Sequence, residues 1–138
     1  MTGFIEFDEY LAEPFPVDHW EDDAIGYAQQ LIASLAPADW EAFERVWVSR
    51  PVRWQVRAAQ VLSRGLPMYA VPLLLCMTES EVMDVVEAAA DSLRDFGSPE
   101  SPLAVPAALI QRLDRLTAER PGPVARAMAD LRRRIRVV

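Results

Sequence analysis

An internal repeat in the second half of the chain constrains its fold more than any other feature. Residues 56–59 are Val-Arg-Ala-Ala, and thirty positions later residues 86–89 are Val-Glu-Ala-Ala. Residues 70–72, Ala-Val-Pro, recur thirty-four positions later as residues 104–106. Residues 124–132 keep the valine, leucine and arginine spacing of the second copy. Two kinds of segment therefore alternate along the chain, which is typical of a stack of repeated units.

Apolar residues recur at helical spacing, and no segment shows the strict alternation of a half-buried strand. Prolines and glycines divide the chain into segments of helical length. We predict an all-α protein with seven helices, at residues 18–36, 37–50, 51–64, 67–77, 80–96, 103–118 and 123–135. The first of these helices has Asp18 and Glu21 in the spacing of a capping box.

The length of 138 residues allows one domain with a sizeable core. We expect residues 1–17 to form an acidic, aromatic arm, with at most one helical turn, lying across a hydrophobic surface. Residues 18–50 should form a helical hairpin, and residues 51–135 should contain the repeats. No apolar run is long enough for a membrane span, and the acidic N-terminus does not suit a signal peptide. We therefore expect a cytoplasmic protein without membrane partners.

The repeated residues resemble a known family. Residues 56–77, VRAAQVLSRGLPMYAVPLLLCM, followed by residues 85–97, VVEAAADSLRDFG, look like HEAT-type repeats of the short bacterial kind. The resemblance covers about residues 51–135. It departs from the family where the alanine pair directly follows Arg57, where Glu87 replaces an arginine, and where a longer linker follows Gly97. The family implies stacked antiparallel helix pairs that present a broad surface to binding partners.

Five carboxylates between residues 78 and 97 fall in one arc of a helical wheel, nearly opposite an apolar stripe. The stripe contains Val82, Val85, Val86, Ala89, Leu93 and Phe96. The carboxylates, here called the acidic ridge, are Glu81, Asp84, Glu87, Asp91 and Asp95. Neighbouring members repel each other by roughly 0.2–0.5 kcal/mol, so the ridge does not help the fold. Three interpretations are open: a solvated face, ion pairs with Arg50, Arg53, Arg57 and Arg64 of the preceding helix, or a binding surface for a basic protein.

Three tryptophans and the single cysteine have expected positions that bear on the core and on binding. Trp54 stands among Arg50, Arg53 and Arg57, and we expect it to stack on arginine at the surface as an interface anchor. Trp40 and Trp47 share a helical face that we expect to be core. Cys76, the single cysteine, lies in an apolar run and is expected to be a buried, inert thiol.

Charge is unevenly distributed along the chain. Residues 1–44 contain eleven acidic residues and no lysine or arginine, while residues 45–138 contain ten acidic residues and fourteen arginines. The net charge is −7. Such an acidic front disfavours nucleic acid and suits a basic protein partner. The arginines after residue 131 are attributed to favourable charge at a helix C-terminus.

Residue types needed for most catalytic sites are scarce in this chain. His19 is the only histidine, and it has no partner at metal-ligand or catalytic spacing. The five glycines do not cluster into a phosphate-binding loop. We expect no catalytic residues, no cofactor and no metal, and therefore no enzyme.

In its small size, acidity and helical repeat the chain resembles the immunity proteins of bacterial polymorphic or contact-dependent toxin systems. This resemblance implies that it neutralises a basic toxin domain, such as a nuclease, through the acidic ridge and Trp54. The alternatives are a HEAT-like scaffold or adaptor protein and an accessory enzyme of the lyase type. The oligomeric state stays open.

Overall fold

Prolines set the starts of several helices in the computed structural model, which describes residues 3–138. Pro37, Pro67 and Pro123 each occupy the first turn of a helix, where a missing backbone N–H costs nothing. These helices are α4 (Pro37–Val46), α6 (Pro67–Met77) and α9 (Pro123–Arg132). The proline and glycine positions therefore predict the segment boundaries well.

The remaining elements complete a mostly helical single domain. Helix α2 (Val17–His19) continues through a π-helical segment, Trp20–Ala24, into α3 (Ile25–Ala33). Helix α5 (Val52–Val61) ends in a 3-10 turn, Leu62–Arg64, and α7 (Met83–Leu93) ends in another, Arg94–Phe96. The other elements are α1 (Gly3–Leu11), α8 (Ala107–Glu119), a 3-10 turn after α4 (Trp47–Ser49), β1 (Leu103–Val105) and β2 (Ile135–Val137).

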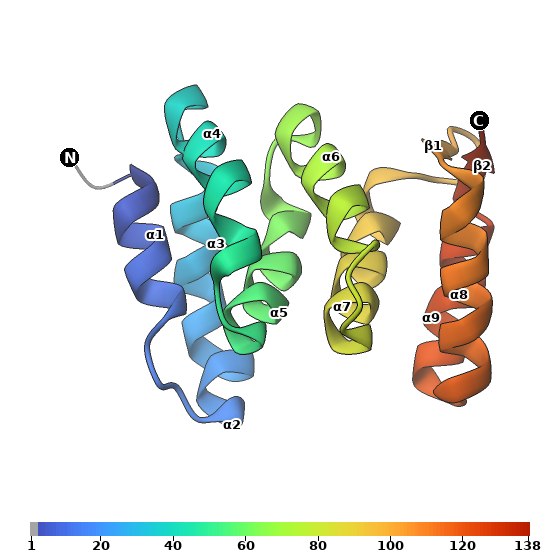
Figure 1. Cartoon of the computed structure of the whole chain (residues 1–138), viewed down its shortest axis with the longest axis horizontal. Helices are drawn as coiled ribbons and strands as arrows, with labels where there is room; N and C mark the ends of the chain where they lie inside the picture. Colours follow the sequence, from blue (N-terminus) through green and yellow to red (C-terminus); the bar gives the residue numbers. More distant parts are fainter. Residues whose placement is uncertain (1–2) are drawn as a thin grey trace.

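The helices follow one another along the long axis, from α1 at one end to α8 and α9 at the other (Figure 1). Helix α7 packs against α5, α6, α8 and α9, so it lies at the centre of the second half. Alanines at the α5–α7 contact, Ala58, Ala59, Ala89 and Ala90, are buried and allow the two backbones to approach closely. The Ser92 hydroxyl donates a hydrogen bond of 2.5 Å to the carbonyl oxygen of Ala59 across this contact.

The predicted apolar stripes form the core. Trp20, Ala24, Ala28, Leu31 and Leu35 are buried, as are Trp40, Phe43 and Trp47 of the next segment. Four members of the α7 stripe are fully buried, namely Val85, Val86, Ala89 and Leu93. The other two members lie outside the helix: Val82, its N-cap, is 37% exposed, and Phe96, in the 3-10 turn that follows, is half-buried.

The N-terminal segment is more regular than expected. Residues 3–11 form helix α1 instead of an irregular arm with a single turn. The expected hydrophobic contact is present, since Phe4 and Phe7 pack their rings on Phe43 with centroids 5.6 and 5.4 Å apart. The capping box expected at Asp18 and Glu21 does not form, because the helix begins one residue earlier at Val17.

The expectation that no strand forms is wrong at two short segments. Strands β1 and β2 pair in parallel, with Leu103 opposite Ile135 and Val105 opposite Val137. Both neighbouring helices are consequently shorter than predicted. Helix α8 begins only after Pro106, and α9 already ends at Arg132. Residues 104–106 are therefore not structurally equivalent to residues 70–72, which lie inside α6. Gly97 adjoins this sheet, where a Cβ atom would clash with the carbonyl oxygen of Arg134.

Candidate functional site

The acidic ridge lies along α7 and the turns that flank it. Asp84, Asp91 and Asp95 are exposed, Glu87 is half-buried, and Glu81 is exposed in the loop before the helix. The packing of α7 explains this arrangement, since its opposite face is buried against α5.

Arginines from the C-terminal half pair with three ridge carboxylates. One terminal nitrogen of Arg120, the residue that follows α8, lies 2.9 Å from Asp84 and 2.5 Å from Glu87. The guanidinium of Arg94 lies 2.7 Å from Asp91, one turn away. The hydrogen bonds that Arg120 donates to Glu87 and Asp84 raise the pKa of Arg120. The ridge is thus partly compensated by Arg94 at its C-terminal end and by Arg120, which follows α8.

The expected ion pairs with the preceding helix are not found. Arg50 donates hydrogen bonds to Asp8 at 2.8 and 2.6 Å instead. Arg57 is buried and binds backbone carbonyl oxygens. Among residues 3–138, Arg53 and Arg64 form no ion pair with the ridge, and both side chains are exposed. The equivalence of Arg57 and Glu87 in the repeat therefore does not bring the two side chains together.

Asp130 of α9 binds three arginine side chains beside the ridge. Its carboxylate accepts hydrogen bonds from Arg94 and Arg134 at 3.0 Å each and from Arg133 at 2.9 Å. The bonds from Arg94 and Arg134 hold the pKa of Asp130 below its usual value. Arg132 pairs with Asp114 of α8. These C-terminal arginines are therefore occupied largely by carboxylates of the same chain.

Three of the ridge carboxylates line one hollow. Asp84, Glu87 and Asp91 border a depression of about 480 Å³ between α5, α7 and α9. A second depression of about 400 Å³ shares Asp91 and Arg94 with the first and adds Asp95. The ridge therefore borders two adjoining hollows instead of lying on a smooth convex face. Glu81 lines neither of them.

Trp54 is not a surface residue, so its expected exposure as an interface anchor is wrong. Its side chain is 1% exposed and packs edge-on against Phe7 and Phe43. The indole N–H donates a hydrogen bond of 3.2 Å to the carbonyl oxygen of Asp8. The expected stacking on arginine is present, with the guanidinium of Arg50 5.9 Å from the ring centroid. Helix α1 covers this position, and its formation could not be foreseen from Trp54 and its neighbours.

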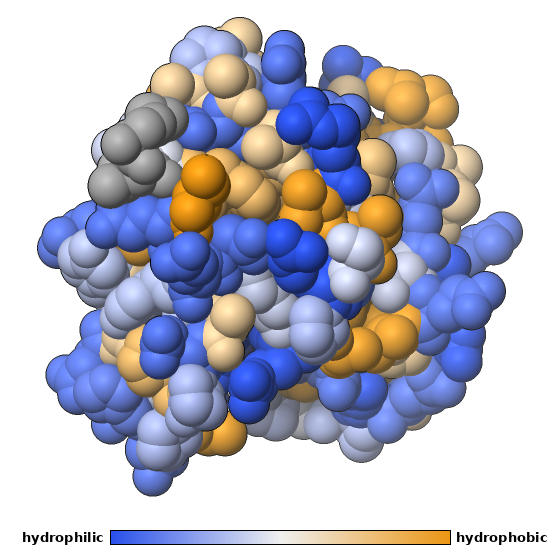
Figure 2. Space-filling view, turned by 60° about the vertical axis from the view of Figure 1, so that its left-hand side comes forward, coloured by the Kyte–Doolittle hydropathy of each residue, from blue (hydrophilic) through white to orange (hydrophobic). Residues whose placement is uncertain are grey.

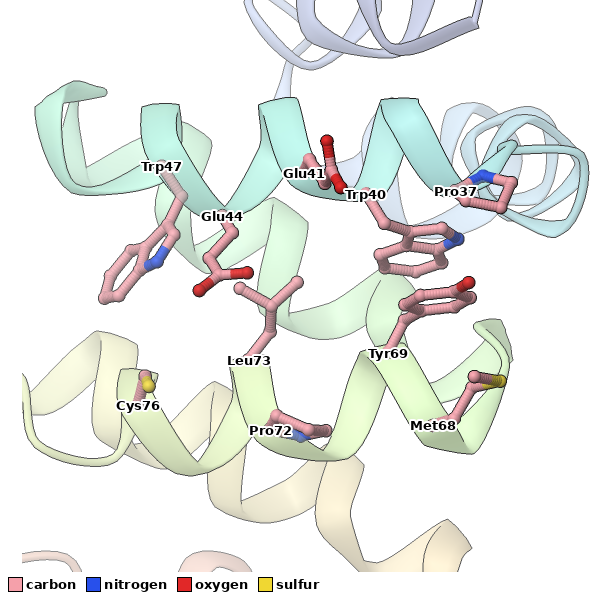
Figure 3. A pocket seen from close by; sticks show the side chains of 10 residues that line it. All are labelled: Pro37, Trp40, Glu41, Glu44, Trp47, Met68, Tyr69, Pro72, Leu73 and Cys76. Atoms are coloured by element: carbon pink, nitrogen blue, oxygen red, sulfur yellow. The ribbon is translucent and has the colours of Figure 1, made fainter.

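Cys76 is exposed, contrary to the expectation of a buried thiol. It lies in a groove of about 290 Å³ between α4 and α6, together with Glu41 and Glu44 (Figure 3). Residues 68, 72 and 76 follow one another at one-turn spacing along the exposed side of α6. The groove is not predictable from the sequence because α6 is apolar on all sides, so periodicity does not indicate which face is covered.

Other side chains with potential chemistry are dispersed. His19 is exposed and lies 3.6 Å from Asp23 on the next turn. Within residues 3–138, no three histidine, cysteine or acidic side chains are grouped so that they could hold a metal ion. In the same range no helix has both the length and the apolarity that crossing a membrane requires.

Comparison of this chain with family models, with curated proteins and with solved structures found no match.

Proposed function

We propose that this chain is a HEAT-like protein-binding module that acts as an immunity protein, neutralising a basic toxin domain. The order of the helices supports the repeat assignment. Helix α5 packs against α7 and α7 against α9, as successive first helices of stacked pairs would, while α6 and α8 contact α7 from the second row. Repeats of this kind serve more often as binding surfaces than as catalysts.

The observation that carries the proposal is the charge left on the ridge after pairing within the chain. Five carboxylates meet two guanidinium groups, those of Arg94 and Arg120, which leaves a charge of −3. Arg94 is also shared with Asp130, which reduces its effect on the ridge. The two adjoining hollows give cationic side chains of a partner room to approach these carboxylates.

The acidic N-terminal half extends this charge. The face that brings the N-terminal end forward is mostly hydrophilic, with small hydrophobic areas between the polar side chains (Figure 2). Glu21, Asp22 and Asp23 are exposed on the π-helical segment that precedes α3. A field of this sign accelerates association with a cationic partner and makes it sensitive to salt. By binding a basic surface of the toxin domain, such as one that normally receives phosphates, the chain would prevent that domain from reaching nucleic acid.

The test uses Glu81 and Asp95, which form no ion pair among residues 3–138, so their neutralisation leaves the pairs within the chain intact. The immunity function predicts that the gene directly upstream encodes a large secreted protein with a toxic C-terminal domain, and that domain is the partner to be used. We expect the wild-type chain to bind that domain and to restore growth of cells that express it. The double variant E81Q/D95N should bind roughly tenfold more weakly and with a smaller salt dependence.

The control is E9Q/E13Q, which removes the same charge from exposed positions on and just after α1, at the opposite end of the molecule from α8 and α9. Equal loss of affinity in both double variants would show a general charge effect and would refute the ridge as the binding surface. Absence of binding and of growth protection by the wild-type chain would refute the immunity function itself.

A scaffold or adaptor protein is the second candidate. The groove between α4 and α6 favours it, because an apolar groove on a different pair of helices offers a further place for a partner. An adaptor would bind a protein partner without protecting cells from a neighbouring toxic domain.

A further inference from the structure

The groove between α4 and α6 has an apolar floor. The ring of Trp40 stacks on Tyr69, with centroids 5.2 Å apart and an interplanar angle of 9°. Leu73 continues the floor toward Trp47 at the other end, as Figure 3 shows. Met68, which lines the groove from α6, is 71% exposed. When a partner covers a long apolar side chain that is this exposed, the free energy of the system falls.

The rim of the groove is acidic. Glu41 and Glu44 stand one helical turn apart on α4, and both line the groove and are exposed. Within residues 3–138 neither of them takes part in an ion pair, and no lysine, arginine or histidine lines the groove. At the far end, burial raises the pKa of the Cys76 thiol, and the charges of Glu79 and Glu44 raise it further. The groove therefore combines apolar contact area with uncompensated negative charge.

The extent of the groove indicates the size of its occupant. The lining residues run from Pro37 on α4 to Trp47, which directly follows that helix, and from Met68 to Cys76 on α6. At 1.5 Å per residue these stretches are about 15 and 12 Å long. Further exposed apolar side chains lie close by in the chain, with Leu66 just before Met68 and Val48 just after Trp47. A single small cation would cover only part of such a surface.

We propose that this groove binds a segment of a partner protein in which arginine or lysine residues alternate with aliphatic residues. The aliphatic side chains would cover Met68, Tyr69 and Pro72, and the cationic groups would pair with Glu41 and Glu44. The site is separate from the function proposed above, because none of its lining residues belongs to the acidic ridge. The groove can therefore be tested while the ridge stays intact.

The probe is an acetylated, amidated peptide of about twelve residues with leucine and arginine repeated at one-turn spacing among alanines. Because Cys76 is the single cysteine and lines the groove, its alkylation by iodoacetamide reports occupancy. At about ten times its dissociation constant, the peptide should slow this alkylation roughly tenfold, since only unoccupied protein reacts. Tryptophan fluorescence gives the dissociation constant independently.

The variant E41Q/E44Q should raise that dissociation constant roughly threefold to tenfold. Each variant is compared with and without peptide, because the charge of Glu44 raises the pKa of the Cys76 thiol and its loss changes the alkylation rate by itself. The control E21Q/D22N, with the same change in charge, should leave the affinity within about twofold.

Four results would overturn the proposal. One is unchanged alkylation of Cys76 at saturating peptide, and another is equal protection by a peptide with glutamate in place of arginine. The third is an equal loss of affinity in the two double variants. The fourth is binding of n-butylguanidinium as tightly as the peptide, which would assign the groove to a small organic cation.

Discussion

Replacement of Arg57 by methionine should destabilise the fold strongly, although both side chains have long flexible stems. Arg57 is 4% exposed, and its guanidinium donates hydrogen bonds to the carbonyl oxygens of Leu11, Glu13 and Phe15 at 3.0, 2.6 and 3.1 Å. It also lies 5.4 and 4.9 Å from the ring centroids of Phe15 and Trp20. A single side chain on α5 thereby holds the connection between α1 and α2 in position through hydrogen bonds to its backbone.

The magnitude follows from what methionine leaves behind. Hydrogen bonds to a charged group contribute about 1.5–3 kcal/mol each, and an unpaired buried carbonyl costs about 1–3 kcal/mol. Opposing this, burial of the guanidinium without a carboxylate is itself unfavourable, and this desolvation, with the charge of Arg53, lowers the pKa of Arg57. Glu13 is exposed, so water can replace part of the lost bonding there. We expect a net loss of about 2–4 kcal/mol for Arg57→Met.

The assay is urea denaturation followed by tryptophan fluorescence and circular dichroism. Arg53→Met is the matched control, because Arg53 lies on the same helix and is exposed. Its free energy of unfolding should stay within about 0.5 kcal/mol of the wild type. Arg57→Lys should lose about 1–2 kcal/mol, because an ammonium group lacks the planar fork that reaches all the carbonyls. Equal stabilities of the Arg57→Met and Arg53→Met variants would refute this account.

Three further predictions concern stability. Gly97→Ala should lower the free energy of unfolding by about 1–3 kcal/mol in urea denaturation, because a Cβ atom would clash with a backbone oxygen. Gly26→Ala should raise it by about 0.5–1 kcal/mol, because Gly26 lies inside a helix with open space where the Cβ atom would be. Asp39→Ala should cost about 1–3 kcal/mol in the same assay, since its carboxylate accepts hydrogen bonds from the backbone N–H groups at the starts of α1 and α4, at 3.0 and 2.8 Å. The pKa of Asp130 is lowered in the fold, so its stabilising effect is present above the ordinary value of 3.8 and is lost as the pH falls through the folded-state pKa. The difference in unfolding free energy between the wild type and Asp130→Asn, measured by urea denaturation across acidic pH, should therefore shrink toward zero in that range, and a constant difference would contradict the pairing.

Local signals were sufficient for most of the helices. Each of the seven predicted segments contains a helix, because proline, which fixes φ and lacks an N–H, and glycine, which has a low helix propensity, mark helix ends wherever they stand. The buried stripes were also predictable, since a helix with apolar residues on one side has only one favourable face to bury. Helix α1 was missed because its short acidic sequence becomes helical in the presence of the surface that buries Phe4 and Phe7.

The candidate site could be predicted only in part. The position of the ridge opposite a buried stripe follows from helical geometry, and the exposed carboxylates of α7 agree with it. The ion pairs of the ridge with Arg120 could not be predicted from the sequence, because Arg120 is 33 residues from Glu87 and approaches it only when α8 lies beside α7. The groove with Glu41 and Cys76 was missed for the same reason, since it exists only between two helices.

The sequence by itself therefore determined a mostly helical chain, the ends of most helices and the faces that must be buried. These properties depend on residues within a few positions of one another. Tertiary structure decided the two short strands, the burial of Trp54 and Arg57, and the pairing of Arg120 with the acidic ridge. Each of these depends on segments more than thirty residues apart, whose approach is set by the packing of the whole stack.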